Sequence, residues 1–225
     1  MHSSSDKDLL KRHKDKWDAL ARENDRYYVR SVDHEQSDEE FDASGRSDVD
    51  AFILGDAALR ARVAPFSNKV VLEIGCGSGR ITKSLARLFR HVIAVDISPT
   101  MLGKAQEFVC SHNVTFIESD GARVPAPPES ADLAFSYIVY QHFPSHEAIR
   151  ESFHGVWRAL RPGGLFKAQI RGKPHADASH WSWGPHCDEA SAAQLAQSTG
   201  YRVITTTGVG TRSFWLLLEK SPSAL

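Results

Sequence analysis

The spacing of apolar residues changes near Lys69 and divides the chain into two parts. In residues 6–24, apolar side chains recur near helical spacing among many charges, which predicts an amphipathic helix. The polar stretch that follows predicts a loop. Asp48 is expected to cap a helix over residues 49–64, which Pro65 would end.

From Lys69 onward, short apolar runs alternate with segments of helical spacing. The runs predict strands at 70–74, 91–95, 114–117, 132–136 and 165–170, and helices are predicted at 81–89, 99–110 and 145–160. This alternation predicts an α/β fold with a parallel sheet covered on both faces. After a loop over 171–187, a helix over 188–198 precedes two strands, 201–207 and 213–219, which predict an antiparallel hairpin.

Composition narrows the class of protein. The 225 residues suffice for one large domain, or for one domain with an appendage. The 27 Lys and Arg residues balance 28 Asp and Glu residues, so we expect no nucleic-acid partner bound by phosphate neutralisation. No apolar run approaches the ~20 residues of a membrane span, and the charged N-terminus is not typical of a secretory signal. Three cysteines without CxxC spacing predict a reducing, cytoplasmic location.

The charges are distributed unevenly along the chain. Residues 1–50 contain 14 of the 28 acidic residues and 9 of the 27 basic ones. A charged segment with few core residues therefore precedes an ordinary globular body, and most of its charges are expected on solvated helix faces.

Three groups of residues follow predicted strands and indicate a nucleoside-containing ligand. Gly75, Gly77 and Gly79 follow the first strand, where glycines let the backbone approach a ligand closely. Asp96 ends the second strand, where a carboxylate is able to accept both ribose hydroxyls of an adenosine. Asp120 follows the third strand and is able to accept from an adenine amino group. Ligands bind at these carboxyl ends in open α/β sheets.

The segments VLEIGCGSGR, VIAVDISPTML, FIESDGARVP, ADLAFSYIVYQHFP and ALRPGGLFKAQI, in this order, resemble the class I S-adenosylmethionine-dependent methyltransferases. The resemblance covers about residues 68–220 and is to the type that acts on small molecules. It implies a Rossmann-like, doubly wound, mostly parallel seven-stranded sheet with an antiparallel last strand. It also implies a helical N-terminal lid over residues 1–67, before a catalytic core over residues 68–225.

The resemblance implies roles for individual residues toward S-adenosylmethionine and its product S-adenosylhomocysteine. Glu73 and the loop Gly75, Cys76, Gly77 and Gly79 would hold the methionine end, and Asp96 the ribose. Ile97, Met101, Asp120, Gly121 and Ala122 would surround the adenine, and Ser136 would lie near the sulfonium. From the lid, Tyr28 would face the sulfonium and Arg46 would pair with the methionine carboxylate.

Two other functions share part of this pattern. A nicotinamide-dependent dehydrogenase also has the glycines and Asp96, but its motif carries a glycine where this chain has Arg80. A non-catalytic S-adenosylmethionine-binding module would keep the loop and lack an acceptor pocket. The Asn-Pro-Pro-Tyr segment of enzymes that methylate DNA amino groups is absent, which agrees with a small-molecule acceptor. Neither the acceptor atom nor the oligomeric state follows from the sequence.

Catalytic candidates follow the fourth strand. His142 titrates in the range of a general base, and Tyr140 is a second candidate. The alternative for both is a structural role: a backbone hydrogen bond for His142 and packing for Tyr140.

Aromatic residues are the candidates for the acceptor pocket. They are Trp17, Tyr28, Tyr137, His180, Trp181 and Trp183, and packing on the core is the alternative for them. The 171–187 loop also contains His186 and Cys187, but this spacing is not that of a known zinc site, so we expect no metal.

Overall fold

The computed structural model describes residues 4–31, 34–176 and 180–221. It divides into two compact units, one ending at Asp120 and the other beginning at Gly121. The seven strands have the order β3-β2-β1-β4-β5-β7-β6. This order, with β7 antiparallel to β5 and to β6, confirms the predicted Rossmann-like sheet with an antiparallel last strand.

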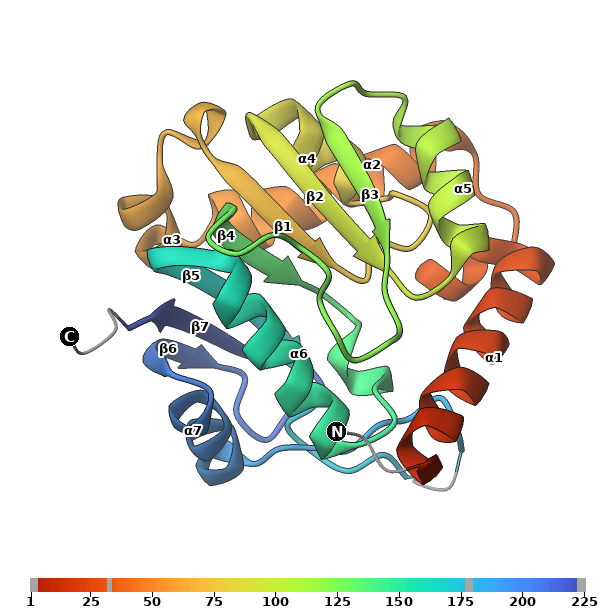
Figure 1. Ribbon diagram of the computed structural model, residues 1–225. Coiled ribbons are helices and arrows are strands. Elements are labelled where there is room, and N and C mark those ends of the chain that lie inside the picture. Colours follow the sequence, from red (N-terminus) through yellow and green to blue (C-terminus); the bar gives the residue numbers. More distant parts are fainter. Residues whose placement is uncertain (1–3, 32–33, 177–179, 222–225) are drawn as a thin grey trace. The chain divides into compact units, whose positions relative to one another are not determined.

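The first unit contains three parallel strands, β1 (Val70–Ile74), β2 (His91–Asp96) and β3 (Val114–Glu118). Between them lie α4 (Thr82–Leu88) and α5 (Pro99–Val109), close to the predicted bounds. All five residues of β1 are buried, as expected of a central parallel strand, whereas β3 is half exposed. Figure 1 shows the three strands side by side, with α5 next to β3.

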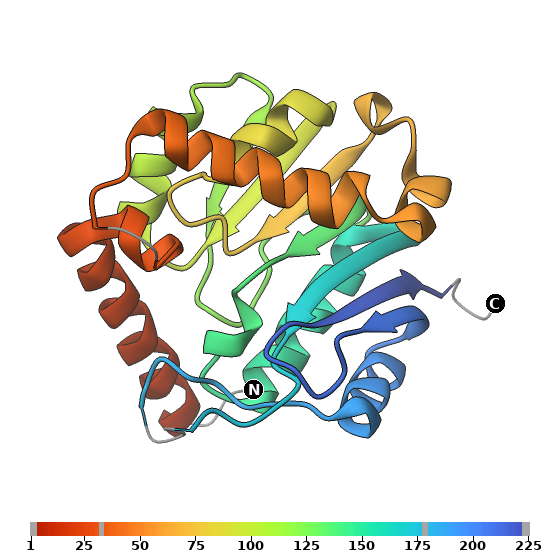
Figure 2. The same cartoon turned by 180° about the vertical axis from the view of Figure 1, so that it is seen from behind.

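Helices α1 and α2 occupy the segment where the sequence analysis expected one helix and a loop. Helix α1 (Ser4–Val29) is broken at Asn24, whose backbone is non-helical and whose side chain accepts a hydrogen bond from Tyr27 N–H. Helix α2 (Asp38–Val49) begins within the expected loop, because Ser37 and Glu40 form a reciprocal capping box. Figure 2 shows α2 crossing one face of the strands of this unit, and it contacts α4.

The prediction of one helix over residues 49–64, capped by Asp48, is wrong. Asp48 lies inside α2, and a π-helical turn over Asp50–Leu54 separates that helix from α3 (Ala57–Val63). Asp56 provides the cap of α3 through a hydrogen bond to Leu59 N–H. A short 3₁₀ turn, Phe66–Asn68, leads into β1.

The second unit contains β4 (Ala131–Ser136), β5 (Leu160–Ile170), β6 (Tyr201–Thr207) and β7 (Phe214–Lys220). Its helices are α6 (His146–Ala159) and α7 (Glu189–Ser198), with a 3₁₀ turn at Tyr140–His142. Helix α6 ends at Ala159, close to the predicted end at 160, and β5 begins at Leu160, five residues before the predicted strand.

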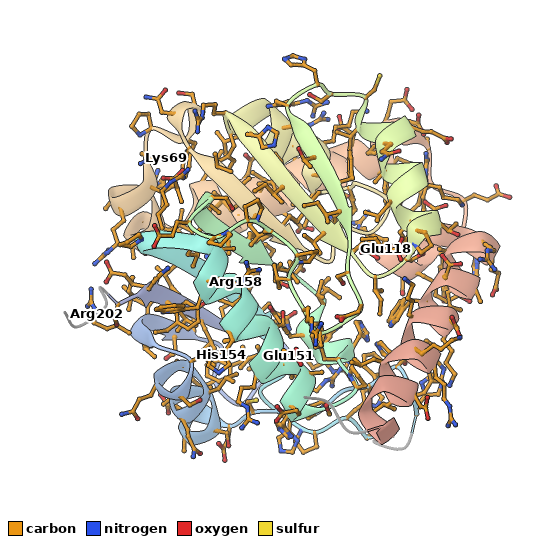
Figure 3. All side chains as sticks on the ribbon, viewed as in Figure 1. Lys69, Glu118, Glu151, His154, Arg158 and Arg202 are labelled. Atoms are coloured by element: carbon orange, nitrogen blue, oxygen red, sulfur yellow. The ribbon has the colours of Figure 1, made fainter. Side chains whose placement is uncertain are left out.

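Aromatic rings form the core of the second unit. Phe153 of α6 packs edge-on against Phe166 of β5 and Tyr140, with ring centroids 5.0 and 5.1 Å away. Tyr201 donates its hydroxyl hydrogen to the Phe153 carbonyl. The opposite side of α6 is polar, and Figure 3 shows Glu151, His154 and Arg158 along it.

Two helical glycines of the first unit give a matched test of packing. A Cβ at Gly45 in α2 would lie 2.0 Å from the Arg80 carbonyl oxygen, whereas a Cβ at Gly103 in α5 would meet nothing within 4 Å. We expect Gly45→Ala to lower the free energy of unfolding by about 1–3 kcal/mol through overpacking. Gly103→Ala should raise it by about 0.5–1 kcal/mol, because alanine favours the helix. Urea unfolding of both variants checks this, and an unchanged Gly45→Ala midpoint would refute the close contact between α2 and Arg80.

Candidate active site

The loop after β1 requires its glycines. Gly75, Gly77 and Gly79 have φ values of 74°, 53° and 90°, in the left-handed region that favours glycine. A Cβ at Gly77 would lie 2.6 Å from the Val29 side chain of α1, and a Cβ at Gly79 would lie 2.7 Å from Val109. The loop is therefore held between helices of its own unit.

Asp96 fixes this loop. Its carboxylate accepts hydrogen bonds from Gly77 N–H at 2.8 Å and from Ser98 N–H at 2.9 Å, and the residue is 9% exposed. Burial raises the Asp96 pKa, and the backbone hydrogen bonds oppose that rise. The two oxygens retain lone pairs for further donors, such as the hydroxyls of a sugar.

Glu73 is a second buried carboxyl group in the same unit. It lies in β1, is 3% exposed, and accepts a hydrogen bond of 2.6 Å from the Thr82 hydroxyl. Burial raises its pKa to about 7, although Thr82 and Arg80 act in the opposite direction. A bound ammonium group would favour the ionised form of this side chain.

Ser78 and Cys76 complete the loop. The Ser78 hydroxyl is buried and has no hydrogen-bond partner among the described residues, which is the kind of orphaned polar atom that a polar ligand satisfies. Sequence reasoning missed Ser78, although its place inside the glycine loop was a usable signal. Cys76 is also buried, which raises the pKa of its thiol well above the usual range.

The predicted adenine residues fall in both units. In the first unit, Met101 is buried at the start of α5, Ile97 is half-buried and Asp120 is exposed. In the second unit, Ala122 is buried and Gly121 has a φ of 94°. Contact of these residues with an adenine stays a prediction.

Helix α1 is attached to the carboxyl end of β2 through a residue that sequence reasoning missed. Asp18 accepts hydrogen bonds from the Ser98 hydroxyl at 2.7 Å and from Thr100 N–H at 3.0 Å. Lys14 pairs with Glu118, which Figure 3 labels, and Asp25 pairs with Lys104. The charges of α1 thus form specific contacts with the elements next to the loop.

The three lid residues predicted to contact ligands have different surroundings. Tyr28 lies in the last turn of α1 beside Val29, and its hydroxyl donates to Glu23. The Trp17 indole donates to His13, one turn away. Arg46 pairs with Asp42, which Arg87 also contacts, and its pairing with the methionine carboxylate stays a prediction.

An ion pair next to the glycine loop was also missed. Arg80, the residue after Gly79, has a buried side chain that pairs with Asp48 of α2 at 2.6 Å. This contact replaces the capping role that the sequence predicted for Asp48, and it binds α2 to the loop.

In the second unit, β4 ends at Ser136, which is fully buried, and the Tyr137 ring stacks on Trp215. Ile138 then has a φ of 59°, a rare conformation for a β-branched residue. Its N–H donates to the buried Gln169 side chain of β5 at 2.9 Å, which supports this turn.

The structure gives both catalytic candidates a structural environment. The Tyr140 ring is buried in the aromatic core, its hydroxyl contacts Ser152, and burial raises its pKa. His142 Nδ1 lies 2.5 Å from the Ser182 carbonyl, so it carries the proton, and Nε2 lies 3.0 Å from the Gln141 amide. Burial lowers the His142 pKa to about 4, so the imidazole is neutral near pH 7. These contacts favour the structural alternative, and a catalytic role for either residue stays a prediction.

The predicted aromatic loop over 171–187 includes residues 177–179, which lie outside the described residues. Trp183 stacks between His142 and His175, with ring centroids 5.3 and 4.1 Å away. His180 and Trp181 are near each other at the start of the described segment. Where the structure describes the chain, no group of three or more His, Cys, Asp or Glu side chains is arranged to hold a metal ion.

The first unit thus gathers two buried carboxyl groups and an unpaired hydroxyl around a glycine loop. Comparison with known proteins identifies this arrangement. A sequence profile described as a methyltransferase domain matches residues 71–164, which include the loop, Asp96 and β4. The trans-aconitate 2-methyltransferase of Rhodopseudomonas palustris is 38% identical over 102 residues, which are 44% of this chain and 38% of that protein.

Residues 71–164 thus match the methyltransferase-domain family, and the chain has the fold of solved S-adenosylmethionine-dependent methyltransferases. Phosphoethanolamine N-methyltransferase 1 of Haemonchus contortus shares the fold, with a TM-score of 0.71 at 19% identity over 96% of this chain and 50% of that one. A methyltransferase of Aquifex aeolicus has a TM-score of 0.58 at 17% identity, over 83% and 100% of the two chains. The matched segments span about two-fifths of the first curated relatives. The strand order differs from the 3-2-1-4-5-6 order of dinucleotide-binding domains, which agrees with the family.

Asp18 provides a test of the attachment of α1. Asp18→Ala should lower the free energy of unfolding at pH 7 by about 1–3 kcal/mol, because it leaves Ser98 and Thr100 without an acceptor. Burial raises the Asp18 pKa, but the hydrogen bonds from Ser98 and Thr100 outweigh it and the net pKa is lowered. The contribution is therefore present above the unfolded value near 3.8 and is lost as the pH falls below it.

Urea unfolding at pH 7 and pH 3 measures this difference. Asp15→Ala is the control, because the exposed Asp15 pairs with Lys11 on the same helix, and its effect should stay within about 0.5 kcal/mol. Equal losses for the two variants at pH 7 would contradict the attachment.

Glu73→Gln tests the raised pKa of Glu73. In the wild type the protonated form is favoured on folding, so stability falls as the pH rises from about 4.5 to about 7. Glutamine stays neutral, so the variant should gain stability relative to the wild type across that range and hold the gain above it. Urea midpoints at pH 5 and pH 8 check this, with the exposed Glu107→Gln as control. A difference between variant and wild type that is the same at both pH values would contradict the raised pKa.

Proposed function

We propose that this protein is an enzyme that uses S-adenosylmethionine to methylate a small-molecule acceptor and forms S-adenosylhomocysteine. The observation that carries the proposal is the pair of buried carboxyl groups, Glu73 and Asp96, at the glycine loop of a domain of this family. The family's cofactor carries an ammonium group and two ribose hydroxyls, and these are the partners that such carboxyl groups take.

In this proposal, different residues of the first unit contact different parts of the cofactor. Asp96 accepts from the ribose hydroxyls, Glu73 favours the methionine ammonium, and the Ser78 hydroxyl gains the partner it lacks within the described residues. Gly77 lets the backbone come close without a side chain in the way. Ile97, Met101, Asp120 and Ala122 stay the adenine candidates.

When bound, the cofactor would supply a methyl group on a positively charged sulfur, open to in-line attack by an acceptor atom. The bond formed to the acceptor would replace the carbon–sulfur bond, whose electron pair would stay on sulfur, and any acceptor proton would go to water or a base. The protein's residues orient the acceptor and exclude water. A neutral acceptor hydroxyl would need a base, for which His142 has both ring nitrogens engaged.

Residues 1–67 act as a lid in this proposal, with residues 68–225 as the catalytic core. The contact of Val29 with Gly77 and the hydrogen bonds of Asp18 support it, because both attach α1 to the elements that carry the cofactor residues.

The acceptor is proposed to be a small molecule and not a nucleic acid, which the near-zero net charge supports. Relatives are named for different acceptors, trans-aconitate and phosphoethanolamine among them, so both belong in a first assay. No helix in the described residues is long and apolar enough to cross a membrane. The cysteines at 76, 110 and 187 are free thiols, which supports a cytoplasmic location.

Calorimetry with S-adenosylhomocysteine, paired with transfer of a labelled methyl group, tests the function. The wild type should bind S-adenosylhomocysteine. Asp96→Ala should bind it at least about 100-fold more weakly, because two hydrogen bonds to a charged group are lost. Gly77→Val should abolish binding, whereas Asp38→Asn, at an exposed ion pair with Arg26, should leave it unchanged. Binding of NAD instead would overturn the proposal, and binding without transfer to any acceptor would indicate a non-catalytic module.

A further inference from the structure

Arg171 is a buried cation whose hydrogen-bonding capacity is unfilled. It directly follows β5 and is 2% exposed, yet its Nε and Nη1 atoms have no hydrogen-bond partner among the described residues. A guanidinium stays charged near neutral pH, and burial of an unpaired charge is costly. An arrangement of this kind is expected to be completed by an anion.

Another arginine of the same unit shows what a structural guanidinium does. Arg158 of α6, labelled in Figure 3, donates from Nη2 to the carbonyls of Val124 and Ala126 at 2.7 and 2.9 Å. Arg158 thereby holds the turn before β4 in place. Arg171 has no such partners at Nε and Nη1, so a purely structural role leaves these donors unexplained.

Aromatic rings and a second cation surround Arg171. Its guanidinium lies 4.6 Å from the centre of the Trp183 ring, which stacks against His142 on the way to the end of β4. Burial lowers the Arg171 pKa, and the neighbouring Arg212 lowers it further, so positive charge is concentrated here. The neighbouring His142 is neutral near pH 7 and therefore does not neutralise the charge of Arg171.

The backbone around this side chain is fixed on both sides. Cys187 N–H donates to the Arg171 carbonyl at 2.9 Å, and Gly172 N–H donates to the Thr211 carbonyl at 2.8 Å. A Cβ at Gly172 would lie 2.8 Å from that same carbonyl oxygen, so the chain has no room to shift there.

Trp183 is held as firmly as Arg171. The carbonyl of its neighbour Ser182 accepts from His142, and Gly184 N–H donates to the Gln141 carbonyl at 2.7 Å. The arginine and the ring beneath it are therefore placed before any ligand arrives.

We propose that Arg171 binds a carboxylate of the methyl acceptor, so that this enzyme acts on carboxylic acids. The assignment rests on the proposed methyltransferase function and names its substrate class. A planar guanidinium matches a planar carboxylate and is able to form two parallel N–H···O hydrogen bonds with it. The carboxyl end of β5, where Arg171 lies, is the edge at which ligands bind in such sheets.

Matched acids and amides test the assignment on the wild type. Phenylacetate and glutarate are titrated into protein saturated with S-adenosylhomocysteine, next to phenylacetamide, glutaramide and inorganic phosphate. We expect at least one acid to bind at least about 10-fold more tightly than its amide, since the amide cannot form a charge-assisted pair. Equal binding of acids and amides, or tighter binding of phosphate than of either acid, overturns the assignment.

Variants locate the effect at Arg171. Arg171→Met should weaken acid binding at least about 10-fold, Arg171→Lys should weaken it less, and affinity for S-adenosylhomocysteine should be unchanged in both. Arg202→Met is the control, because the exposed Arg202 of β6 pairs with Glu219, and it should bind the acids like the wild type. Unchanged acid binding by Arg171→Met overturns the assignment.

A measurement on the wild type covers the case in which Arg171→Met does not fold. The ¹⁵Nε resonance of Arg171, identified by its absence in Arg171→Lys, should shift when the acid is added, and no shift overturns the assignment. If the wild type does not bind S-adenosylhomocysteine, the proposed function itself is overturned. Binding of that product with no binding of either acid defeats only the carboxylate assignment.

Discussion

The buried carboxylate of Asp96 is the contact on which the geometry of the first unit depends. It accepts from Gly77 in the loop after β1 and from Ser98 after β2, so two loops that follow different strands are tied to one side chain. The Ser98 hydroxyl then donates to Asp18, which extends the chain of hydrogen bonds to α1. A buried carboxylate must have donors, and here the donors are N–H groups of the two loops that a cofactor would meet. The same requirement therefore stabilises the fold and shapes the candidate site.

The charged residues before β1 are more than a solvated surface. Asp18, Asp25, Asp42 and Asp48 each contact a residue that follows the glycine loop in the sequence, and two of these partners are Arg80 and Arg87. Isolated exposed ion pairs contribute little, but the Arg80 side chain is buried, so its pair with Asp48 matters more for specificity. The acidic excess of residues 1–50 thus matches basic and polar groups of the core of the same unit.

The second unit contrasts with the first in how its buried charges are satisfied. Asp96 accepts from two backbone N–H groups, whereas Nε and Nη1 of Arg171 have no partner among the described residues. Both side chains follow strands at the carboxyl end, where α/β sheets bind ligands. Asp96 therefore orders two loops, whereas Arg171 has donors available for an anion. The proposed binding of a carboxylate by Arg171 would select acidic acceptors, a selectivity that the family alone does not determine.

The sequence determined the regular parts of this protein. The apolar runs predicted β1 to β7 and α4 to α7, because buried strands and helical spacing depend on residue type over a few neighbouring positions. The resemblance of five segments to class I S-adenosylmethionine-dependent methyltransferases predicted the family. The capping box of Ser37 and Glu40 was also legible but was passed over, so α2 was predicted as a loop. Only the tertiary structure decided that Asp48 pairs with Arg80 and that Asp18 accepts from Ser98. It also decided that Nε and Nη1 of Arg171 have no hydrogen-bond partner among the described residues, whereas both ring nitrogens of His142 contact protein groups. These side-chain contacts form between residues tens of positions apart in the sequence, once the chain has folded. The local spacing of residues therefore does not predict them.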